Sequence, residues 1–175
     1  MSRVIVAYDE ETIRRRVAEL ADEIAAALPG DVLVVAILKG AAIFAADLLR
    51  EMSRAGMEPE IEFLRLRSYG AGQWSSGDVV AVGAAPDVAG RAVLLVDAIL
   101  DSGRSLAAAR RIVGEGGAAS VHACVLVEKP GRAVAVEADF RGFRAGSAFL
   151  VGYGTDAAEA HRHLPVLATL LDEPD

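Results

Sequence analysis

The chain has 175 residues, a net charge of −7 and a single cysteine. We expect one domain over residues 1–175, because this length is enough to bury a sizeable core. No apolar run long enough to span a membrane is present, and the N-terminus lacks the apolar segment of a signal peptide. Cys124 cannot form an internal disulfide, so a cytoplasmic protein is expected. The acidic balance argues against a nucleic-acid partner.

Lysine is rare in this chain. Sixteen of the 18 basic residues are arginines, and the two lysines are Lys39 and Lys129. One interpretation is that they are remnants of an arginine-rich composition. The other is that an ammonium is needed at these positions, because a guanidinium is planar and bulkier and does not replace it. Composition alone leaves both interpretations open.

The first third of the sequence alternates between strand and helix patterns. A short strand is expected at residues 4–8. Asp9 is placed to cap a helix that runs to residue 28, with apolar residues recurring at spacings of three and four. The apolar run at 31–38 is typical of a strand buried on both faces. A second helix is expected over 41–54.

The same alternation continues to the C-terminus, with less regularity in the last third. Strands are expected at residues 60–67, 92–96 and 120–127, a loop at 68–78, a turn at 97–105, a helix at 106–114, and further strands near 134–138, 148–151 and 166–169. Alternating strands and helices indicate an α/β fold with a mainly parallel twisted sheet flanked by helices.

Polar groups are concentrated directly after the strand at 92–96. Asp97 and Asp101 come first, and Ser102-Gly103-Arg104-Ser105 follows at the start of the next helix. Ligands of parallel α/β sheets bind beyond the carboxyl ends of the strands. Backbone N–H groups at a helix N-terminus, with hydroxyls beside them and a glycine that permits close approach, can hold a monophosphate. Simple helix capping would explain one of these residues and not the whole group.

This segment resembles the phosphoribosyl pyrophosphate (PRPP) signature of type I phosphoribosyltransferases, and further motifs in family order resemble the hypoxanthine-guanine branch. These motifs are Leu38-Lys39-Gly40, Ser68-Tyr69-Gly70 with Ser75-Ser76-Gly77-Asp78, Val127-Glu128-Lys129-Pro130, and Phe149-Leu150-Val151-Gly152-Tyr153-Gly154-Thr155-Asp156 with Arg162. The resemblance implies the type I phosphoribosyltransferase fold with a small hood, built from segments near 1–10 and 130–175. It also implies a flexible catalytic loop at about 68–79, including Ser68 and Tyr69.

The activity implied by the resemblance is Mg²⁺-dependent transfer of the 5-phosphoribosyl group from PRPP to hypoxanthine and/or guanine, giving IMP or GMP and pyrophosphate. Asp101 would be the general base that faces the imidazole ring of the purine. Lys129 would donate to the 6-oxygen, which selects 6-oxopurines over adenine. Phe149 would stack on the base, and Ile99 and Leu150 would also contact it.

The resemblance assigns the remaining site residues to PRPP and the metal. Ser102, Gly103, Arg104 and Ser105 would hold the 5′-phosphate, and Asp97 would bind the ribose. Pyrophosphate would contact Lys39, Gly40 and Arg162, at a turn that in the family often contains a cis peptide after Leu38. Asp97 and Asp156 would hold Mg²⁺.

The chain departs from the family at Ala98, where a second acid usually follows the first. A methyl group accepts no hydrogen bond, so one ribose or metal contact is lost or supplied elsewhere. This leaves open a relative that acts on a modified 6-oxo- or deazapurine. A PRPP-sensing regulatory protein of the same fold is disfavoured by the acidic charge. Family members usually form homodimers or homotetramers, so we expect a homo-oligomer. Because the sequence has no apolar run that could span a membrane, we expect no membrane partner.

Overall fold

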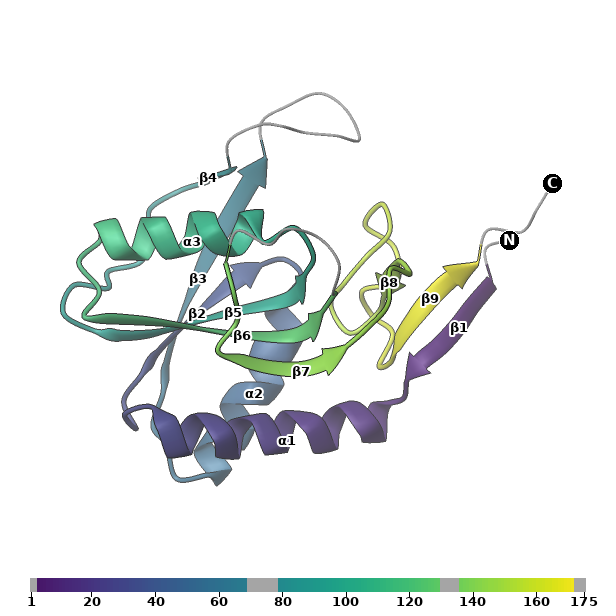
Figure 1. Ribbon diagram of the computed structural model, residues 1–175, viewed down its shortest axis with the longest axis horizontal. Helices are drawn as coiled ribbons and strands as arrows, with labels where there is room; N and C mark the ends of the chain where they lie inside the picture. The colour runs from purple at the N-terminus through teal and green to yellow at the C-terminus, as the bar shows by residue number, and fades with distance from the viewer. Residues whose placement is uncertain (1–2, 69–78, 130–135, 172–175) are drawn as a thin grey trace.

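The computed structural model describes residues 3–68, 79–129 and 136–171. Within these ranges the chain forms two sheets and three helices (Figure 1). The helices are α1 (Glu10–Ala27), α2 (Ala42–Arg54) and α3 (Arg104–Glu115). None of the described helices is both long enough and apolar enough to cross a membrane.

The larger sheet has six strands in the order β4-β3-β2-β5-β6-β7. Its strands are β2 (Leu33–Leu38), β3 (Glu60–Ser68), β4 (Val79–Ala81), β5 (Ala92–Leu100), β6 (Ser120–Glu128) and β7 (Phe140–Arg144). All neighbouring strands run parallel except β4, which pairs antiparallel with the end of β3. The expected α/β class with a mainly parallel sheet is therefore confirmed.

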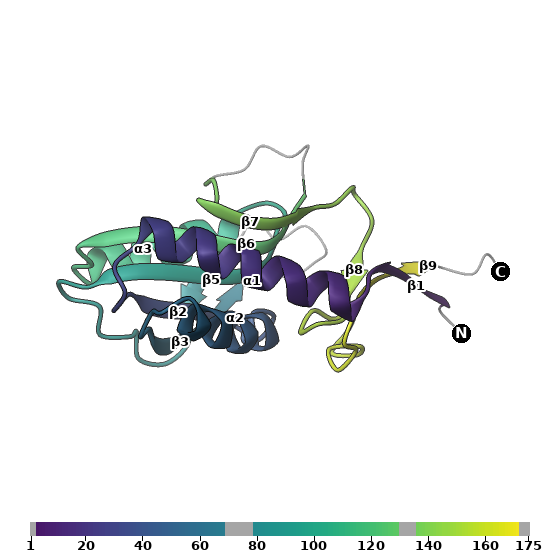
Figure 2. The same ribbon diagram turned by 90° about the horizontal axis from the view of Figure 1, so that it is seen from below.

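Helices cover both faces of this sheet, which explains the near-continuous apolar strands. Helices α1 and α2 pack on one face and α3 on the other (Figures 1 and 2). Alternate residues of β2 accordingly belong to two different apolar clusters, with Val34 facing α1 and α2, and Val35 facing α3. Asp9 caps α1 as expected, because its side chain accepts a hydrogen bond from the Thr12 N–H at 2.8 Å.

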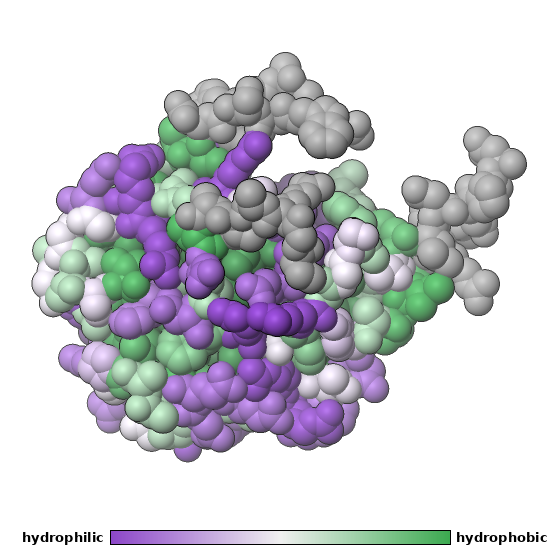
Figure 3. All heavy atoms as spheres, viewed as in Figure 1, coloured by the Kyte–Doolittle hydropathy of each residue, from purple (hydrophilic) through white to green (hydrophobic). Residues whose placement is uncertain are grey.

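A small antiparallel sheet forms the hood beside the carboxyl ends of the large sheet (Figure 1). Its strands follow the order β1-β9-β8, so segments from the two ends of the chain lie side by side. They are β1 (Arg3–Tyr8), β9 (Leu167–Leu171) and β8 (Leu150–Val151). Figure 3 shows apolar surface over the hood, at the right of the view. On β1, the large apolar side chains Ile5 and Val6 are exposed.

Two sequence-based boundaries are wrong. The expected turn at 97–105 begins too early, because β5 continues to Leu100 and pairs with β6 up to Glu128. The strand expected near 134–138 is not formed in its described residues, 136–138, and the strand β7 begins at Phe140 instead. The apolar pattern at Val136 and Ala138 has another cause: both side chains pack in the apolar cluster beneath α3, and neither residue pairs in the sheet.

The position of β7 depends on a glycine that weakens its strand pattern. A Cβ atom at Gly142 would lie 2.5 Å from the carbonyl oxygen of Leu126 on the neighbouring strand β6. Arg16 of α1 then donates to the carbonyl oxygens of Arg141 and Gly142, at 2.8 and 2.9 Å. Strand β7 is therefore fixed by close backbone approach on one side and by α1 on the other.

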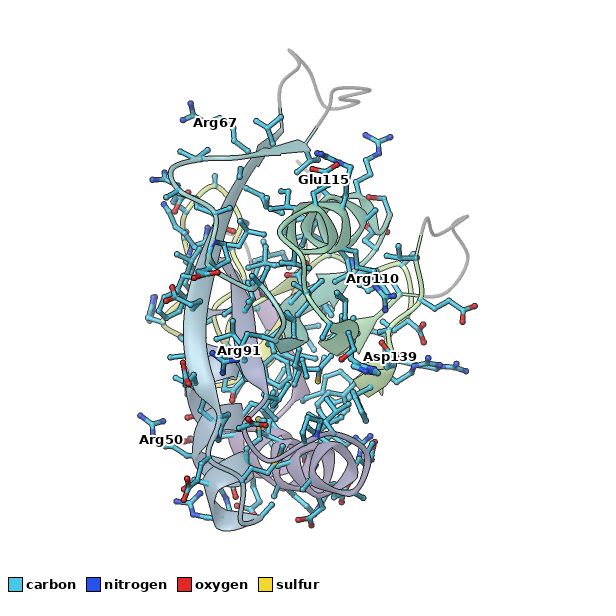
Figure 4. The ribbon with its side chains drawn as sticks, turned by 90° about the vertical axis from the view of Figure 1, so that its left-hand side faces the viewer. Arg50, Arg67, Arg91, Arg110, Glu115 and Asp139 are labelled. Atoms are coloured by element: carbon cyan, nitrogen blue, oxygen red, sulfur yellow. The ribbon has the colours of Figure 1, made fainter. Side chains whose placement is uncertain are left out.

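Ion pairs connect elements at the end of the sheet opposite the hood, which faces the viewer in Figure 4. Arg110 of α3 lies 2.9 Å from Asp139, which precedes β7. Arg91 before β5 lies 3.2 Å from Glu60 at the start of β3. These partly exposed pairs contribute little individually, about 0–1 kcal/mol each. The polar cleft described below lies at the other end of the sheet.

We predict that Gly142→Ala destabilises the fold by about 2–3 kcal/mol, because the added methyl overpacks against the backbone of β6. Urea unfolding monitored by circular dichroism measures this change. Gly146→Ala is the matched control, since a Cβ atom there meets nothing within 4 Å. Equal stability of the two variants would contradict the close approach of β6 and β7.

Candidate active site

A cleft of about 400 Å³ lies between the carboxyl ends of the central strands and the hood. It brings together residues from every described motif that the sequence singled out. They are Lys39, Gly40, Asp97, Ile99, Asp101, Ser105, Lys129, Phe149, Leu150, Asp156 and Arg162. The parallel topology explains this convergence, because β2, β5 and β6 all end at the same edge of the sheet.

A smaller hollow of about 170 Å³ adjoins the cleft at the start of α3. It is lined by the Asp101–Ser105 turn, including Ser102 and Arg104, which lie outside the larger cleft. Gly103 occupies the N-cap with φ of 74°, a left-handed conformation that favours glycine, and it offers no capping side chain. The first N–H groups of α3 therefore border a hollow of a size suited to a phosphate group.

Asp97 lies in β5, and its Oδ1 accepts a hydrogen bond from the Ala98 N–H at 2.8 Å. Burial raises the pKa of the Asp97 carboxyl to about 7, and this hydrogen bond opposes the rise only in part. In the free protein, burial thus disfavours the ionised form of the Asp97 carboxyl. A cationic ligand or a hydroxyl donor placed in the cleft would favour the ionised form.

Lys129 and Phe149 lie on one side of the cleft, as the sequence predicts. The Lys129 N–H donates to the Leu100 carbonyl at 2.9 Å, which anchors the residue after β6. Its Nζ lies 5.9 Å from the centre of the Phe149 ring. Phe149 is 56% exposed, so it is not a core residue. An open aromatic ring beside an ammonium is suited to a flat ligand that carries a carbonyl oxygen.

The Lys39-Gly40 turn contacts the hood directly. The Leu38–Lys39 peptide bond is cis. Gly154 has φ of 96°, and a Cβ atom there would lie 2.5 Å from the Gly40 carbonyl oxygen. The preceding residue, Tyr153, donates its hydroxyl to Asp47 of α2 at 2.6 Å. These contacts hold the hood against the turn that follows β2.

Two carboxylates of the hood contact the cationic side chains of Lys39 and Arg162. Arg162 Nη2 lies 2.8 Å from Asp156 Oδ1 and 3.3 Å from Glu159 Oε2. Lys39 Nζ lies 3.0 Å from the same Glu159 oxygen. Lys39 and, to a lesser extent, Arg162 lower the pKa of Glu159, so this carboxyl is ionised near neutrality. The cations expected to bind pyrophosphate are therefore already paired in the free protein.

Sequence reasoning missed two residues here. Thr155 lines the cleft, with its hydroxyl donating to the Gly152 carbonyl at 2.8 Å. Glu159 was missed because a single glutamate in an alanine-rich turn carries no pattern. Of the expected flexible loop, the structure places Ser68 at the end of β3. Tyr69 and the rest of that loop to residue 78 lie outside the described residues.

The donor set of the cleft is compatible with Mg²⁺. Asp97, Asp101 and Asp156 supply only carboxylate oxygens, the hard ligands that Mg²⁺ prefers. Among the described residues, no three acidic, histidine or cysteine side chains could hold a metal ion by themselves. This fits an ion held by one or two carboxylates together with substrate phosphates.

Comparisons with known proteins agree with this geometry. The family described as Phosphoribosyl transferase domain matches residues 8–158. The chain is 37% identical over 177 residues to the hypoxanthine phosphoribosyltransferase of Salmonella typhimurium, covering 97% of this chain and 98% of the relative. It is 39% identical to the bifunctional protein TilS/HprT of Listeria innocua, and spans 26% of that protein's length.

Solved structures show the same likeness. A hypoxanthine-guanine phosphoribosyltransferase from Bacillus anthracis is 32% identical, with a TM-score of 0.86 over 95% of this chain and 98% of the other. The chain belongs to the phosphoribosyltransferase family, and the resemblance noted from its motifs is confirmed.

We predict that Asp97→Asn stabilises the free protein in a pH-dependent manner. The unfolded carboxyl ionises near pH 3.8 and the folded one near 7, so the parent protein loses stability as pH rises between these values. The amide does not ionise. The variant should be about equally stable at pH 4 and more stable by about 4 kcal/mol at pH 8. Urea unfolding across this range measures the difference, and a pH-independent difference would contradict the raised pKa.

Proposed function

We propose that the protein is a purine-salvage enzyme that transfers the 5-phosphoribosyl group of PRPP to hypoxanthine and/or guanine, releasing pyrophosphate. The observation that carries this proposal is the convergence of three subsites in the cleft and its adjoining hollow. A helix N-terminus suits a phosphate, an ammonium beside an open ring suits a 6-oxopurine, and a pair of cations suits pyrophosphate. Full-length similarity to hypoxanthine phosphoribosyltransferases supports the same assignment.

The phosphate and ribose of PRPP would lie over the end of β5. The backbone of Ser102, Gly103, Arg104 and Ser105 would bind the 5′-phosphate, because the first N–H groups and the positive end of α3 border the adjoining hollow. Asp97 would accept hydrogen bonds from ribose hydroxyls. This arrangement would put the anomeric carbon between the purine subsite and the Lys39-Gly40 turn.

Asp101 would manage the proton of the purine. A neutral purine carries one N–H on its imidazole ring, and bond formation at the other ring nitrogen leaves that ring cationic. A carboxylate beside the N–H stabilises the developing charge and accepts the proton as the glycosidic bond forms. Asp101 lines both the cleft and the hollow, so it can reach a base placed above the ribose.

The base subsite would select for a 6-oxo group. The Lys129 ammonium has only donors, so it pairs with a carbonyl oxygen and is mismatched to the amino group of adenine. Phe149 would stack on the purine, with Ile99 and Leu150 at its edges. Guanine and hypoxanthine both satisfy this arrangement.

The leaving group would be held by Lys39, Gly40 and Arg162, and the positive charges of Lys39 and Arg162 would offset the charge that develops on pyrophosphate. Asp97 and Asp156 would hold Mg²⁺ together with the oxygens of PRPP. When bound, Mg²⁺ neutralises phosphate charge and orients the leaving group. Asp156 would also keep Arg162 in place through their 2.8 Å contact.

Ala98 is the reason to keep a second candidate, the same transfer to a modified 6-oxo- or deazapurine. Its methyl group is buried beside Gly40, at the position where the family usually has an acid. Pyrophosphate release with PRPP, Mg²⁺ and each of hypoxanthine, guanine, xanthine, adenine and 7-deazaguanine separates the two. We expect hypoxanthine or guanine to be fastest. A preference for the deazapurine would favour the alternative, and no release with any base would reject both.

The proposal includes a single phosphoribosyltransferase domain, a homo-oligomer, a cytoplasmic location and no nucleic-acid partner. The family match over residues 8–158 supports the first of these. The homo-oligomer rests on the resemblance to the family. Cys124 is a buried free thiol, as expected in a reducing compartment.

We predict that Asp101→Asn lowers kcat by about 10²–10⁴-fold, the range for loss of a general base, while PRPP binds with near-normal affinity. Steady-state assays of nucleotide formation and calorimetric titration with PRPP measure the two effects. Near-normal turnover of the variant would reject the proposed role of Asp101.

Substitution by arginine should affect catalysis differently at the two lysines. Lys129→Arg should raise KM for the base at least tenfold, because a planar guanidinium is too large to replace a point donor beside Phe149. Lys39→Arg should be milder, since the backbone of its turn and the retained charge both serve pyrophosphate. Assays with each substrate varied in turn measure KM for base and PRPP. Equal effects of both substitutions on the base would contradict the assignment of Lys129.

A further inference from the structure

The hood hairpin at 157–160 places a carboxylate over the pyrophosphate subsite. Ala157 and Ala160 form an isolated antiparallel bridge, with hydrogen bonds of 3.2 and 2.9 Å in the two directions. The two residues between them, Ala158 and Glu159, have φ of 49° and 66°. Positive φ at both central residues is the feature of a type I′ hairpin turn, where Asn and Gly are preferred.

Glutamate at the second central position therefore works against the turn. A left-handed conformation is costly for a residue with a Cβ atom, and glycine would adopt it freely. What the glutamate adds is its side chain, which lies 3.0 Å from Lys39 Nζ and 3.3 Å from Arg162 Nη2. The backbone N–H of Glu159 donates to Asp156 Oδ2 at 2.7 Å, and this hydrogen bond holds the backbone from which the glutamate side chain extends.

The contacts of Glu159 coincide with those proposed for pyrophosphate. Lys39 and Arg162 both border the cleft, and one oxygen of Glu159 contacts both. An anion that binds between these cations must break both contacts. Because Lys39 and Glu159 are more than half exposed, the contacts are weak enough to be exchanged.

We propose that Glu159 is an internal competitor of pyrophosphate that sets how tightly the cleft holds it. The carboxylate pairs with both Lys39 and Arg162 when the subsite is empty, and it forms these contacts again as pyrophosphate leaves. Glu159 thus weakens binding of free pyrophosphate and promotes its release after transfer. This inference rests on the proposed function of the cleft, and it concerns a residue that the motifs did not mark.

Glu159→Gln tests the proposal by removing the charge while keeping the size of the side chain. Calorimetric titration with sodium pyrophosphate, with and without Mg²⁺, should show three- to tenfold tighter binding than in the parent protein, as expected for the loss of weak competing ion pairs. Glu159→Gly should show the same gain in affinity and should not be less stable, because glycine favours the left-handed turn. If the glutamine variant is misfolded by circular dichroism, the glycine variant decides.

Glu115→Gln is a matched control on α3, on the face shown in Figure 4. Glu115 is 64% exposed and lies 3.2 Å from Arg111, while Glu159 is 65% exposed and lies 3.3 Å from Arg162. The control makes the same change in net charge, so it should leave pyrophosphate affinity unchanged. Equal tightening in both variants would mean that net charge alone is responsible and would overturn the proposal.

The remaining outcomes are also decisive. Unchanged or weaker pyrophosphate binding in both Glu159 variants, with a parent protein that binds pyrophosphate and forms nucleotide, would reject competition by Glu159. Tighter binding without Mg²⁺ but weaker binding with it would make Glu159 a metal-site acid and would also reject the proposal. A parent protein that neither binds pyrophosphate nor forms nucleotide would instead reject the proposed function.

Discussion

The fold depends on burial of parallel strands on both faces. Strands β2, β5 and β6 are apolar almost throughout, because α1 and α2 cover one face of the sheet and α3 the other. Polar side chains are therefore excluded from the interior and gather where these strands end. Since parallel strands end at one edge, residues distant in sequence meet there, and the hood closes the cleft from the other side (Figures 1 and 2).

The charged groups of the site are compensated within the free protein. A cleft that binds PRPP, as we propose, needs groups for two anionic phosphate regions and for a cation, and these groups are unfavourable when left alone. Burial keeps Asp97 partly protonated near neutrality, and Glu159 pairs with Lys39 and Arg162. A bound substrate would replace these internal contacts with its own. Its affinity therefore depends on the difference in free energy between the substrate contacts and the internal contacts that they replace.

The sequence predicted the features that follow from apolar periodicity and from the positions where strands end. The apolar runs located β2, β5 and β6, and the polar residues after them line one cleft. Lys129 and Phe149 lie together as expected, and the exposure of the ring excludes a core role. The features that the sequence did not predict depend on contacts between distant segments. Strand β7 is fixed by Gly142 against β6, and Glu159 matters only because the hairpin brings it to Lys39.

A crystal structure with IMP and pyrophosphate tests the central claim, that one cleft holds all three parts of the reaction. The account predicts the nucleotide phosphate on the backbone of residues 102–105 and the purine 6-oxygen on Lys129. Pyrophosphate should contact Lys39 and Arg162, with the Glu159 carboxylate displaced from both. Binding of the nucleotide outside this cleft, or with its base at the start of α3, would contradict the account.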